Sequence, residues 1–352
     1  MLLEGIHAAI TTPFYPDERI YFRKLEANMA HYSRSLLAGI LVLGSTGEAV
    51  MLNDEESRQV LRVAAEAAAP DKILIAGVGR ESVGATVAMA EAAAEYRFDA
   101  VLVRPPSYYA GQLNTAAVRN YFESVADRSP LPVILYNIPK FVPYQIPVEL
   151  VAELANHPNI IGIKDSSGSL DRIRETVAAT QSARRRTVTV TTVFEAVTAR
   201  MLTPAPEPAG TFVSANDLAG GAAVAATAPP ATALKTRIKE VGFQVLCGAG
   251  SKVLASLEAG ATGAILGVAA FAPQACTEIY LAWKDHDQKL AEEKQARILA
   301  ANARVVSDLG IPGIKYACDF NGFYGGRTRS PLLGLSSAEK TEVEGLLTGI
   351  RN

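Results

Sequence analysis

The stretch IIGIKDSSG, residues 160–168, ends an apolar and largely β-branched run on a lysine. A run of this kind is typical of a buried strand, where an unpaired ammonium is costly. Burial favours the neutral amine, which is a nucleophile that forms Schiff bases with carbonyl compounds. The alternative is that Lys164 extends to solvent or pairs with Asp165. Other motifs of the chain help to decide between these two roles of Lys164.

Eight short apolar runs recur along the chain, separated by longer stretches rich in Ala, Glu and Arg. Such strands, alternating with helices, are typical of a parallel sheet covered by helices. Eight units in series predict an α/β fold, the TIM (β/α)8 barrel, and no Gly-x-Gly-x-x-Gly follows the first run as a dinucleotide fold requires. The predicted strands are Ile6–Thr11, Ile40–Leu43, Ile73–Val78, Ala100–Val103, Val133–Tyr136, Ile160–Lys164, Phe243–Leu246 and Gly263–Leu266.

The barrel is expected to occupy residues 1–284, followed by a helical region over residues 285–352. Asn53 and Glu56 have the spacing of a capping box, which predicts a helix over Ser57–Ala69. After the eighth strand the sequence predicts helices at about 272–284, 288–308 and 336–350.

An insertion of about 185–241 separates the sixth helix from the seventh strand, where a short loop is usual. Thr187–Val193 has the pattern of a strand and Phe194–Leu202 that of a helix, whereas Thr203–Pro208 and Ala222–Thr232 are expected to be irregular. Helix-to-strand loops lie at the N-terminal face of a barrel, opposite the catalytic face. We therefore expect the insertion not to build the active site.

Composition limits the classes of function. The 352 residues carry a formal net charge of −2, which does not suggest a nucleic-acid or membrane-surface partner. No apolar stretch reaches about 18 residues, so no membrane span is expected. Cys247, Cys276 and Cys318 are too few and too far apart for a disulfide framework, which favours a cytoplasmic protein. The four histidines have no metal-ligand spacing, so we expect no metal site.

The catalytic groups of a TIM barrel come from the C-terminal ends of its strands. The loop Gly44–Glu48 follows the second strand and offers two hydroxyls and several backbone N–H groups, a suitable cradle for a carboxylate. The alternative is a tight turn with a capping serine.

Lys164 and Tyr136 end the sixth and fifth strands, so both can point at the barrel mouth. Residues two apart on a strand share a face, so Gly162 lies on the face of Lys164 and is expected to leave room for it. Ile161 and Ile163 are expected to face the helices.

The motifs Gly44–Glu48, Tyr136–Pro139 and Gly162–Ser166, in this order and spacing, resemble the dihydrodipicolinate synthase/N-acetylneuraminate lyase family. The resemblance covers nearly the whole chain except the insertion. It implies a Schiff-base aldolase that uses pyruvate or another 2-oxo acid together with an aldehyde, has no cofactor and forms a homotetramer. Further matching positions are Pro106–Tyr109, Gly248 and Gly263–Ile265.

The resemblance also implies roles for single residues. Lys164 condenses with the ketone, and Tyr136 transfers protons with Thr46 as its hydrogen-bond partner. Ser45 and Thr46 hold the substrate carboxylate, and Tyr109 reaches the site of a neighbouring subunit to complete a proton relay. Further substrate contacts are expected from Ser166, Gly248 and Ile265.

One position departs from the synthase branch, in which an arginine two residues after the proline of the tyrosine motif binds the second substrate. Phe141 stands there, and Lys140 is the adjacent cation. Ser166 and the tail residues 310–326 are similar to 4-hydroxy-2-oxoglutarate aldolase and to 2-keto-3-deoxy acid aldolases, which are the expected activities. The alternatives in the family are 4-hydroxy-tetrahydrodipicolinate synthase and N-acetylneuraminate lyase.

Two readings outside the family remain. Gly248–Ser251 could bind phosphate at a helix start, as in a phosphosugar enzyme, although a second glycine-rich turn is missing after the eighth strand. A barrel without catalysis could sense 2-oxo acids, but the presence of both Lys164 and Tyr136 argues against this.

Overall fold

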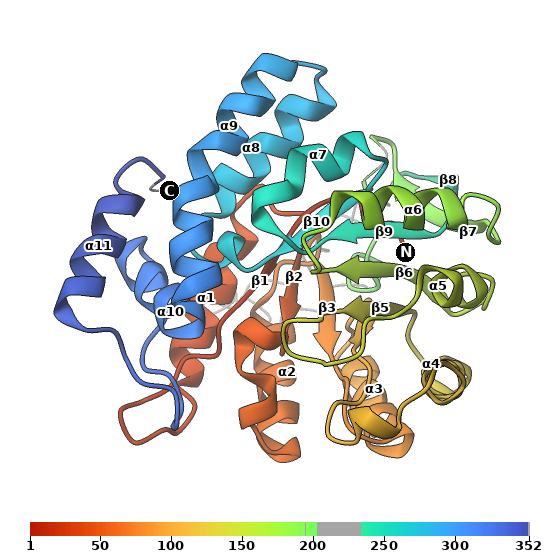
Figure 1. Ribbon diagram of the computed structural model, residues 1–352, viewed down its shortest axis with the longest axis horizontal. Helices are drawn as coiled ribbons and strands as arrows, with labels where there is room; N and C mark the ends of the chain where they lie inside the picture. The colour runs from red at the N-terminus through yellow and green to blue at the C-terminus, as the bar shows by residue number, and fades with distance from the viewer. Residues whose placement is uncertain (194, 203–233, 351–352) are drawn as a thin grey trace, which may run out of the picture.

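The computed structural model describes residues 1–193, 195–202 and 234–350. Eight parallel strands close a barrel in the order β1-β10-β9-β6-β5-β4-β3-β2 (Figure 1), which confirms the predicted TIM barrel. The strands are β1 Gly5–Ala9, β2 Gly39–Val42, β3 Ile73–Gly77, β4 Ala100–Val103, β5 Val133–Asn137, β6 Ile160–Asp165, β9 Gln244–Cys247 and β10 Gly263–Leu266.

Eight helices surround the barrel, one after each strand unit, and cover the outer faces of the strands (Figure 1). The predicted capping box is present: the Asn53 side chain accepts a hydrogen bond from the Glu56 N–H, and the Glu56 carboxylate accepts one from the Asn53 N–H. The helices are α1 Phe22–Ser33, α2 Asp54–Ala67, α3 Val83–Glu95, α4 Thr115–Arg128, α5 Val148–Leu154, α6 Leu170–Thr180, α7 Val253–Glu258 and α8 Pro273–Lys284.

The pairing of β5 with β6 contains an irregularity that the sequence does not reveal. Val133 pairs with Ile160 but Ile134 pairs with Gly162, so Ile161 has no partner in the register. The extra residue lets Ile161 join the inner cluster of the barrel with Tyr136, so the expectation that it faces the helices is wrong. Gly162 allows a close approach instead, because a Cβ there would lie 2.4 Å from the Gln244 carbonyl oxygen on β9.

The helical C-terminal part follows α8 and packs along one side of the barrel (Figure 1). The predicted helix at 288–308 is present as α9, Gln288–Ala301, which continues as the π-helix η7, Asn302–Asp308. The last predicted helix is α11, Ser337–Leu347. Between them lies α10, Gly310–Phe320, which was not expected as a helix.

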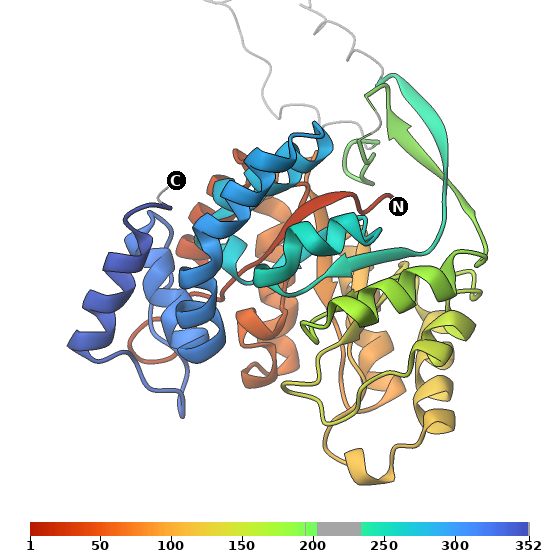
Figure 2. The ribbon, with the colours of Figure 1, turned by 45° about the horizontal axis from the view of Figure 1, so that its top comes forward.

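The insertion begins and ends as an antiparallel hairpin that lies beside the N-terminus (Figure 2). Its strands are β7 Arg186–Thr191, which confirms the predicted strand, and β8 Thr236–Val241. The predicted helix over Phe194–Leu202 is wrong for its described part, because residues 195–202 form turns and a bridge to Val190. The predicted irregular stretches Thr203–Pro208 and Ala222–Thr232 lie outside the described residues.

The turns after β7 contact the N-terminal ends of the barrel strands, as expected for a helix-to-strand insertion. The Asp99 carboxylate precedes β4 and accepts hydrogen bonds from the N–H groups of Leu74 and Ala199, both at 2.9 Å. The Arg200 guanidinium lies 3.5 Å from Asp99 and donates to the Lys72 carbonyl oxygen. The described part of the insertion therefore covers the barrel end that is opposite the strand-end motifs.

His7 on β1 makes the stability of the barrel dependent on pH. The ring is fully buried, and this burial lowers its pKa to about 4, although the Leu3 carbonyl oxygen acts in the opposite direction. Between pH 6.5 and 4 the unfolded chain binds a proton that the folded chain does not, so stability falls as the pH falls through this window. We expect this loss to reach about 3 kcal/mol in the free energy of unfolding.

The measurement is urea unfolding at pH 7.5 and 4.5. A His7→Gln variant is expected to lose about 2 kcal/mol less than the wild type between these two pH values. His286→Asn is the control, because His286 is exposed and its backbone has φ 61°, which Asn adopts readily. An equal pH dependence in the wild type and His7→Gln would contradict the prediction.

No helix in the described residues is long and apolar enough to cross a membrane.

Candidate active site

Lys164 and Tyr136 meet at the C-terminal ends of β6 and β5. The two residues are register partners, and the Lys164 Nζ atom lies 3.2 Å from the Tyr136 hydroxyl and 4.3 Å from the centre of its ring. Lys164 is only 4% exposed and Tyr136 only 6%. The arrangement holds an amine beside a phenol in a site largely shielded from water, so a proton can pass between them.

Asp165 does not form an ion pair with Lys164, so the alternative in which these two residues pair is wrong. Its carboxylate forms a buried ion pair with the Arg172 Nε atom at 2.7 Å and accepts a hydrogen bond from Asn137 at 2.9 Å. The Ser167 N–H donates to the other carboxylate oxygen at 2.9 Å. This network fixes the ends of β5 and β6 and leaves the lysine amine available. No motif in the sequence indicated Arg172, which comes from the buried side of α6.

The loop after β2 forms two short 3₁₀ turns, Ser45–Gly47 and Ala49–Met51. The bonds of the first turn use the N–H groups of Gly47 and Glu48, so those of Ser45 and Thr46 at its start are the ones open to a ligand. The Thr12 hydroxyl holds the turn by donating to the Gly47 carbonyl oxygen at 2.7 Å. The described residues include no hydrogen bond between Thr46 and Tyr136, so the expected pairing of these two side chains stays a prediction.

Glu48 closes this loop and pairs with a lysine from α10. Its carboxylate lies 2.5 Å from the Lys315 Nζ atom, and both side chains are 1% exposed. It also accepts a hydrogen bond from the Arg329 N–H at 2.9 Å. Burial lowers the pKa of Lys315, and the Glu48 carboxylate opposes that shift. The C-terminal part thus anchors the end of the Ser45–Glu48 loop, a role that no spacing in the sequence indicated.

Ser166 and Gly248 come together at the ends of β6 and β9. The Gly248 N–H donates to the Asp165 carbonyl oxygen at 2.7 Å, and a Cβ at Gly248 would lie 2.0 Å from the Ser166 hydroxyl oxygen. Ile265 is fully buried in the inner cluster of the barrel, which also contains Tyr136.

Tyr108 and Tyr109 lie on the loop after β4 and are strongly exposed. Their rings pack edge to face with centres 5.0 Å apart, and 63% of Tyr109 is accessible. The Glu81 carboxylate holds this loop, because it accepts hydrogen bonds from the N–H groups of Ser107 and Tyr108. The expected reach of Tyr109 into a neighbouring subunit stays a prediction.

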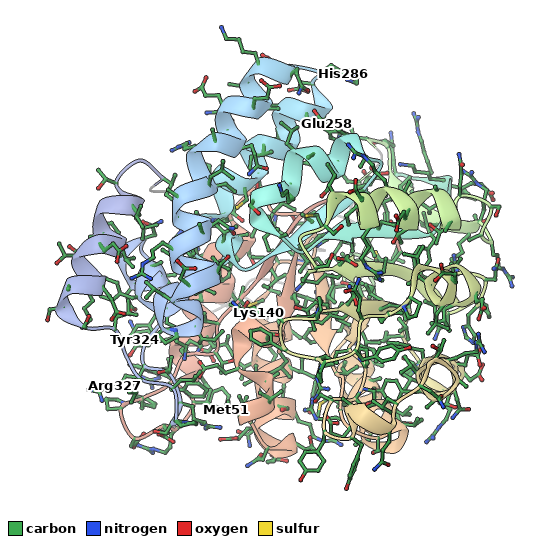
Figure 3. All side chains as sticks on the ribbon, viewed as in Figure 1. Met51, Lys140, Glu258, His286, Tyr324 and Arg327 are labelled. Atoms are coloured by element: carbon green, nitrogen blue, oxygen red, sulfur yellow. The ribbon has the colours of Figure 1, made fainter. Side chains whose placement is uncertain are left out.

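A cavity of about 660 Å³ opens beside Tyr136, which lines it together with Ser45 and Phe141. Lys140 does not take the place of the missing arginine. Figure 3 labels Lys140 beside the C-terminal helices. Its Nζ atom donates to the Ser307 carbonyl oxygen of η7 at 2.8 Å.

The alternative phosphate site after β9 is occupied by side chains from the C-terminal helices. A Cβ at Gly250 would lie 2.2 Å from the Asn302 Oδ1 atom. The Leu254 N–H, in the first turn of α7, donates to the Gln295 side chain at 3.0 Å. The Leu254 N–H therefore already has a partner, and the Asn302 side chain lies against the loop that would hold the phosphate.

The chain matches known proteins over almost its full length. The model of the "Dihydrodipicolinate synthetase family" matches residues 2–188 and 221–350. A 4-hydroxy-tetrahydrodipicolinate synthase from Acidiphilium cryptum is 28% identical over 99% of both chains. An L-threo-3-deoxy-hexylosonate aldolase from Hypocrea jecorina is also 28% identical, over 97% of this chain and 93% of its own.

Solved structures share the fold. A prophage protein of the dihydrodipicolinic acid synthase family from E. coli K12, in complex with pyruvate, has a TM-score of 0.78 and 23% identity over 99% of both chains. Dihydrodipicolinate synthase DapA-2 from Bacillus anthracis has a TM-score of 0.79 and 22% identity over the full length of both.

Proposed function

Because the chain belongs to the dihydrodipicolinate synthetase family and is a carbon–carbon lyase, we propose that Lys164 forms a Schiff base with pyruvate or another 2-oxo acid. One observation carries the proposal: the buried Lys164 amine has the Tyr136 hydroxyl as its neighbour at 3.2 Å, while Arg172 pairs with the carboxylate of the adjacent residue, Asp165. A nucleophilic amine beside a proton-transfer group is the arrangement that imine chemistry requires.

The proposed reaction balances without a metal or cofactor. The Lys164 amine adds to the ketone carbon. The ketone oxygen takes one proton from the amine and one from solvent and leaves as water, and an iminium forms. C3 returns a proton to solvent to give an enamine, whose C3 attacks the aldehyde carbon. The aldehyde oxygen takes a proton from the Tyr136 hydroxyl. Water then hydrolyses the iminium, which frees the lysine and releases the proton that restores the Tyr136 hydroxyl. Cleavage runs the same steps in reverse.

The loop after β2 supports binding of the 2-oxo acid carboxylate. Ser45 and Thr46 offer two hydroxyls and the two open N–H groups of their turn. Backbone donors at such a turn are suited to an anion. We propose that the product is of the 4-hydroxy-2-oxoglutarate or 2-keto-3-deoxy acid type, because Phe141 replaces the arginine expected in the synthase and Lys140 is bound elsewhere.

The test is to incubate the protein with pyruvate, reduce it with borohydride and measure the intact mass and the modified peptide. We expect a single reduced pyruvate adduct on Lys164. A protein that forms no adduct, or forms it at another lysine, would refute the proposal.

Tyr136→Phe is expected to separate imine formation from the later proton transfers. Removing the hydroxyl should lower kcat by about 100-fold or more, because a positioned acid–base group typically contributes 10²–10⁴-fold. Pyruvate trapping on Lys164 should persist at longer incubation. Tyr144→Phe is the matched control, since its hydroxyl contacts only Thr115 at 3.4 Å among the described residues. Full activity in the Tyr136→Phe variant would contradict the proposed role of the Tyr136 hydroxyl in proton transfer.

A further inference from the structure

The cavity that Tyr136 and Ser45 line is also lined by two arginines from the ends of β3 and β4, Arg80 and Arg104. The volume of about 660 Å³ is in the range of small-molecule sites. The proposed reaction brings an aldehyde beside Tyr136, which lines this space, so the charge of the lining bears on which aldehyde binds.

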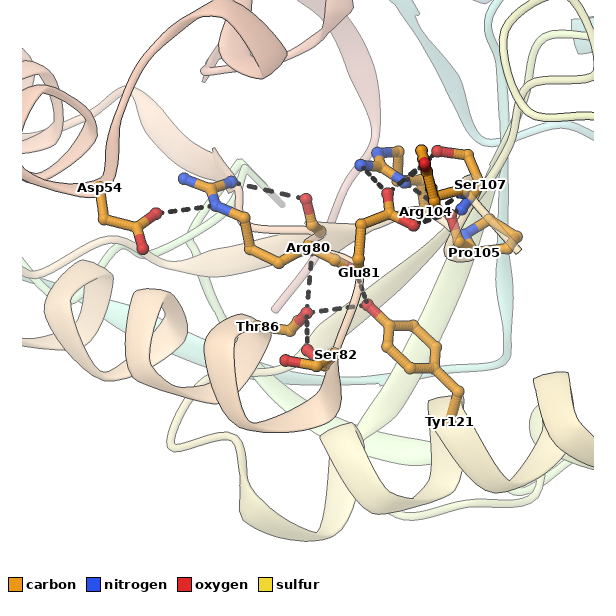
Figure 4. A network of polar contacts seen from close by, with 11 residues as sticks. Asp54, Arg80, Glu81, Ser82, Thr86, Arg104, Pro105, Ser107 and Tyr121 are labelled. Atoms are coloured by element: carbon orange, nitrogen blue, oxygen red, sulfur yellow. Dashed lines mark hydrogen bonds and ion pairs between the residues drawn. The ribbon is translucent and has the colours of Figure 1, made fainter. Parts of the chain in front are cut away.

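Arg80 already has a carboxylate partner. Its Nε atom lies 3.0 Å from Asp54 in the first turn of α2 (Figure 4). Its Nη2 atom donates to the Ser57 hydroxyl at 3.1 Å. The side chain is 17% exposed, so the guanidinium is held in place and its charge is balanced.

The positive charge of Arg104 is balanced in the same way by Glu81, whose Oε1 atom lies 2.9 Å from the Arg104 Nη2 atom (Figure 4). Partial burial alone would raise the pKa of Glu81, but the N–H groups of Tyr108 and Ser107 and the Arg104 guanidinium outweigh it and lower the pKa to about 2. Glu81 is therefore ionised at any physiological pH, and the second pair is also neutral as a whole.

No further cation lines this cavity within the described part of the chain. Phe141 contributes an aromatic ring where the synthase branch is expected to carry a guanidinium, and Lys140 is bound to Ser307. A carboxylate on the incoming aldehyde would have to displace Asp54 or Glu81, or lie close to their negative charges.

We propose that the aldehyde partner is uncharged and polyhydroxylated, and that its hydroxyls bind at the Arg80–Asp54 and Arg104–Glu81 pairs. The inference rests on the proposed function and narrows it to products of the 2-keto-3-deoxy sugar acid class. A hydroxyl both donates and accepts hydrogen bonds, and a guanidinium–carboxylate pair offers both kinds of partner. A product with a second carboxylate, such as 4-hydroxy-2-oxoglutarate, lacks a free cation here.

The first experiment measures kcat/KM for condensation with pyruvate over two sets of aldehydes. Glycolaldehyde and D- and L-glyceraldehyde are uncharged, whereas glyoxylate and succinic semialdehyde carry a carboxylate. We expect the best uncharged aldehyde to exceed both charged ones by about 10-fold or more. A higher value with either charged aldehyde, or no turnover of any uncharged one, overturns the inference.

The second experiment removes the carboxylate that pairs with one of the two arginines. Asp54→Asn removes the partner of Arg80, so the kcat/KM ratio of glyoxylate to glyceraldehyde is expected to rise about 10-fold. Glu55→Gln removes a charge from the same helix turn, but the Glu55 carboxylate accepts a hydrogen bond from Gln59, whereas Asp54 is the residue that pairs with Arg80, so the ratio should stay unchanged. A ratio that is equal in the wild type and Asp54→Asn would contradict the role of the pair.

Borohydride trapping distinguishes a wrong aldehyde class from a wrong proposed function. A protein that forms the pyruvate adduct but prefers charged aldehydes retains the proposed function and loses this inference. A protein that forms no adduct on Lys164 loses the proposed function itself.

Discussion

Lys164→Ala is expected to form no pyruvate adduct under borohydride and to lose aldolase turnover by about 10⁴-fold or more, because removing a covalent nucleophile removes the intermediate. The side chain is buried beside Tyr136, and its loss leaves no other amine at that hydroxyl among the described residues. The measurements are intact-mass analysis after trapping and steady-state release of pyruvate.

Two further variants test whether the reaction needs the amine of Lys164 itself rather than a positive charge or another lysine. Lys164→Arg keeps a cation but cannot form an imine with the ketone, so it should behave like Lys164→Ala. Lys140→Ala removes a lysine whose Nζ atom contacts Ser307 rather than Tyr136, so trapping should remain as in the wild type. An adduct that persists in Lys164→Arg would contradict the assignment.

Lys315→Met is expected to lower the free energy of unfolding by about 3–5 kcal/mol, because it leaves the Glu48 carboxylate buried without its cation. Urea unfolding at pH 7.5 measures the change. The pair lies behind the Ser45–Glu48 loop, so we also expect a higher KM for pyruvate at temperatures where the variant remains folded.

The double variant Lys315→Met with Glu48→Gln should regain most of the lost stability, because the uncompensated charge is gone. Lys289→Met is the control, since Lys289 is exposed on α9. A Lys315→Met protein within about 1 kcal/mol of the wild type would show that water or another group compensates Glu48.

The barrel and the Lys164–Tyr136 pair could be predicted because they depend on local patterns. Each strand is a short apolar run, the strand order follows from the chain, and the period of two fixes which side chains share a face. The bulge at Ile161 could not be predicted in this way, because it arises from the register between β5 and β6 rather than from either strand alone.

The side chains that pair with the site residues could not be predicted for a related reason. Glu48 and Lys315 are 267 positions apart along the sequence, and their contact exists only because α10 packs against the barrel. Arg172 lies on the same helix as ordinary surface residues, so the sequence pattern of that helix does not indicate its ion pair with Asp165. The helix predicted over Phe194–Leu202 is wrong for residues 195–202, where Ala199 and Arg200 contact Asp99 at the barrel end.

The hairpin of β7 and β8 makes the insertion a side branch of the chain. Arg186 and Val241 face each other in the register, so the polypeptide leaves and rejoins the barrel at one point. The entropic cost of closing such a branch grows slowly with its length. Evolution, or a protein engineer adding a reporter, can therefore change the length of the segment between the two strands while α6 and β9 keep their separation.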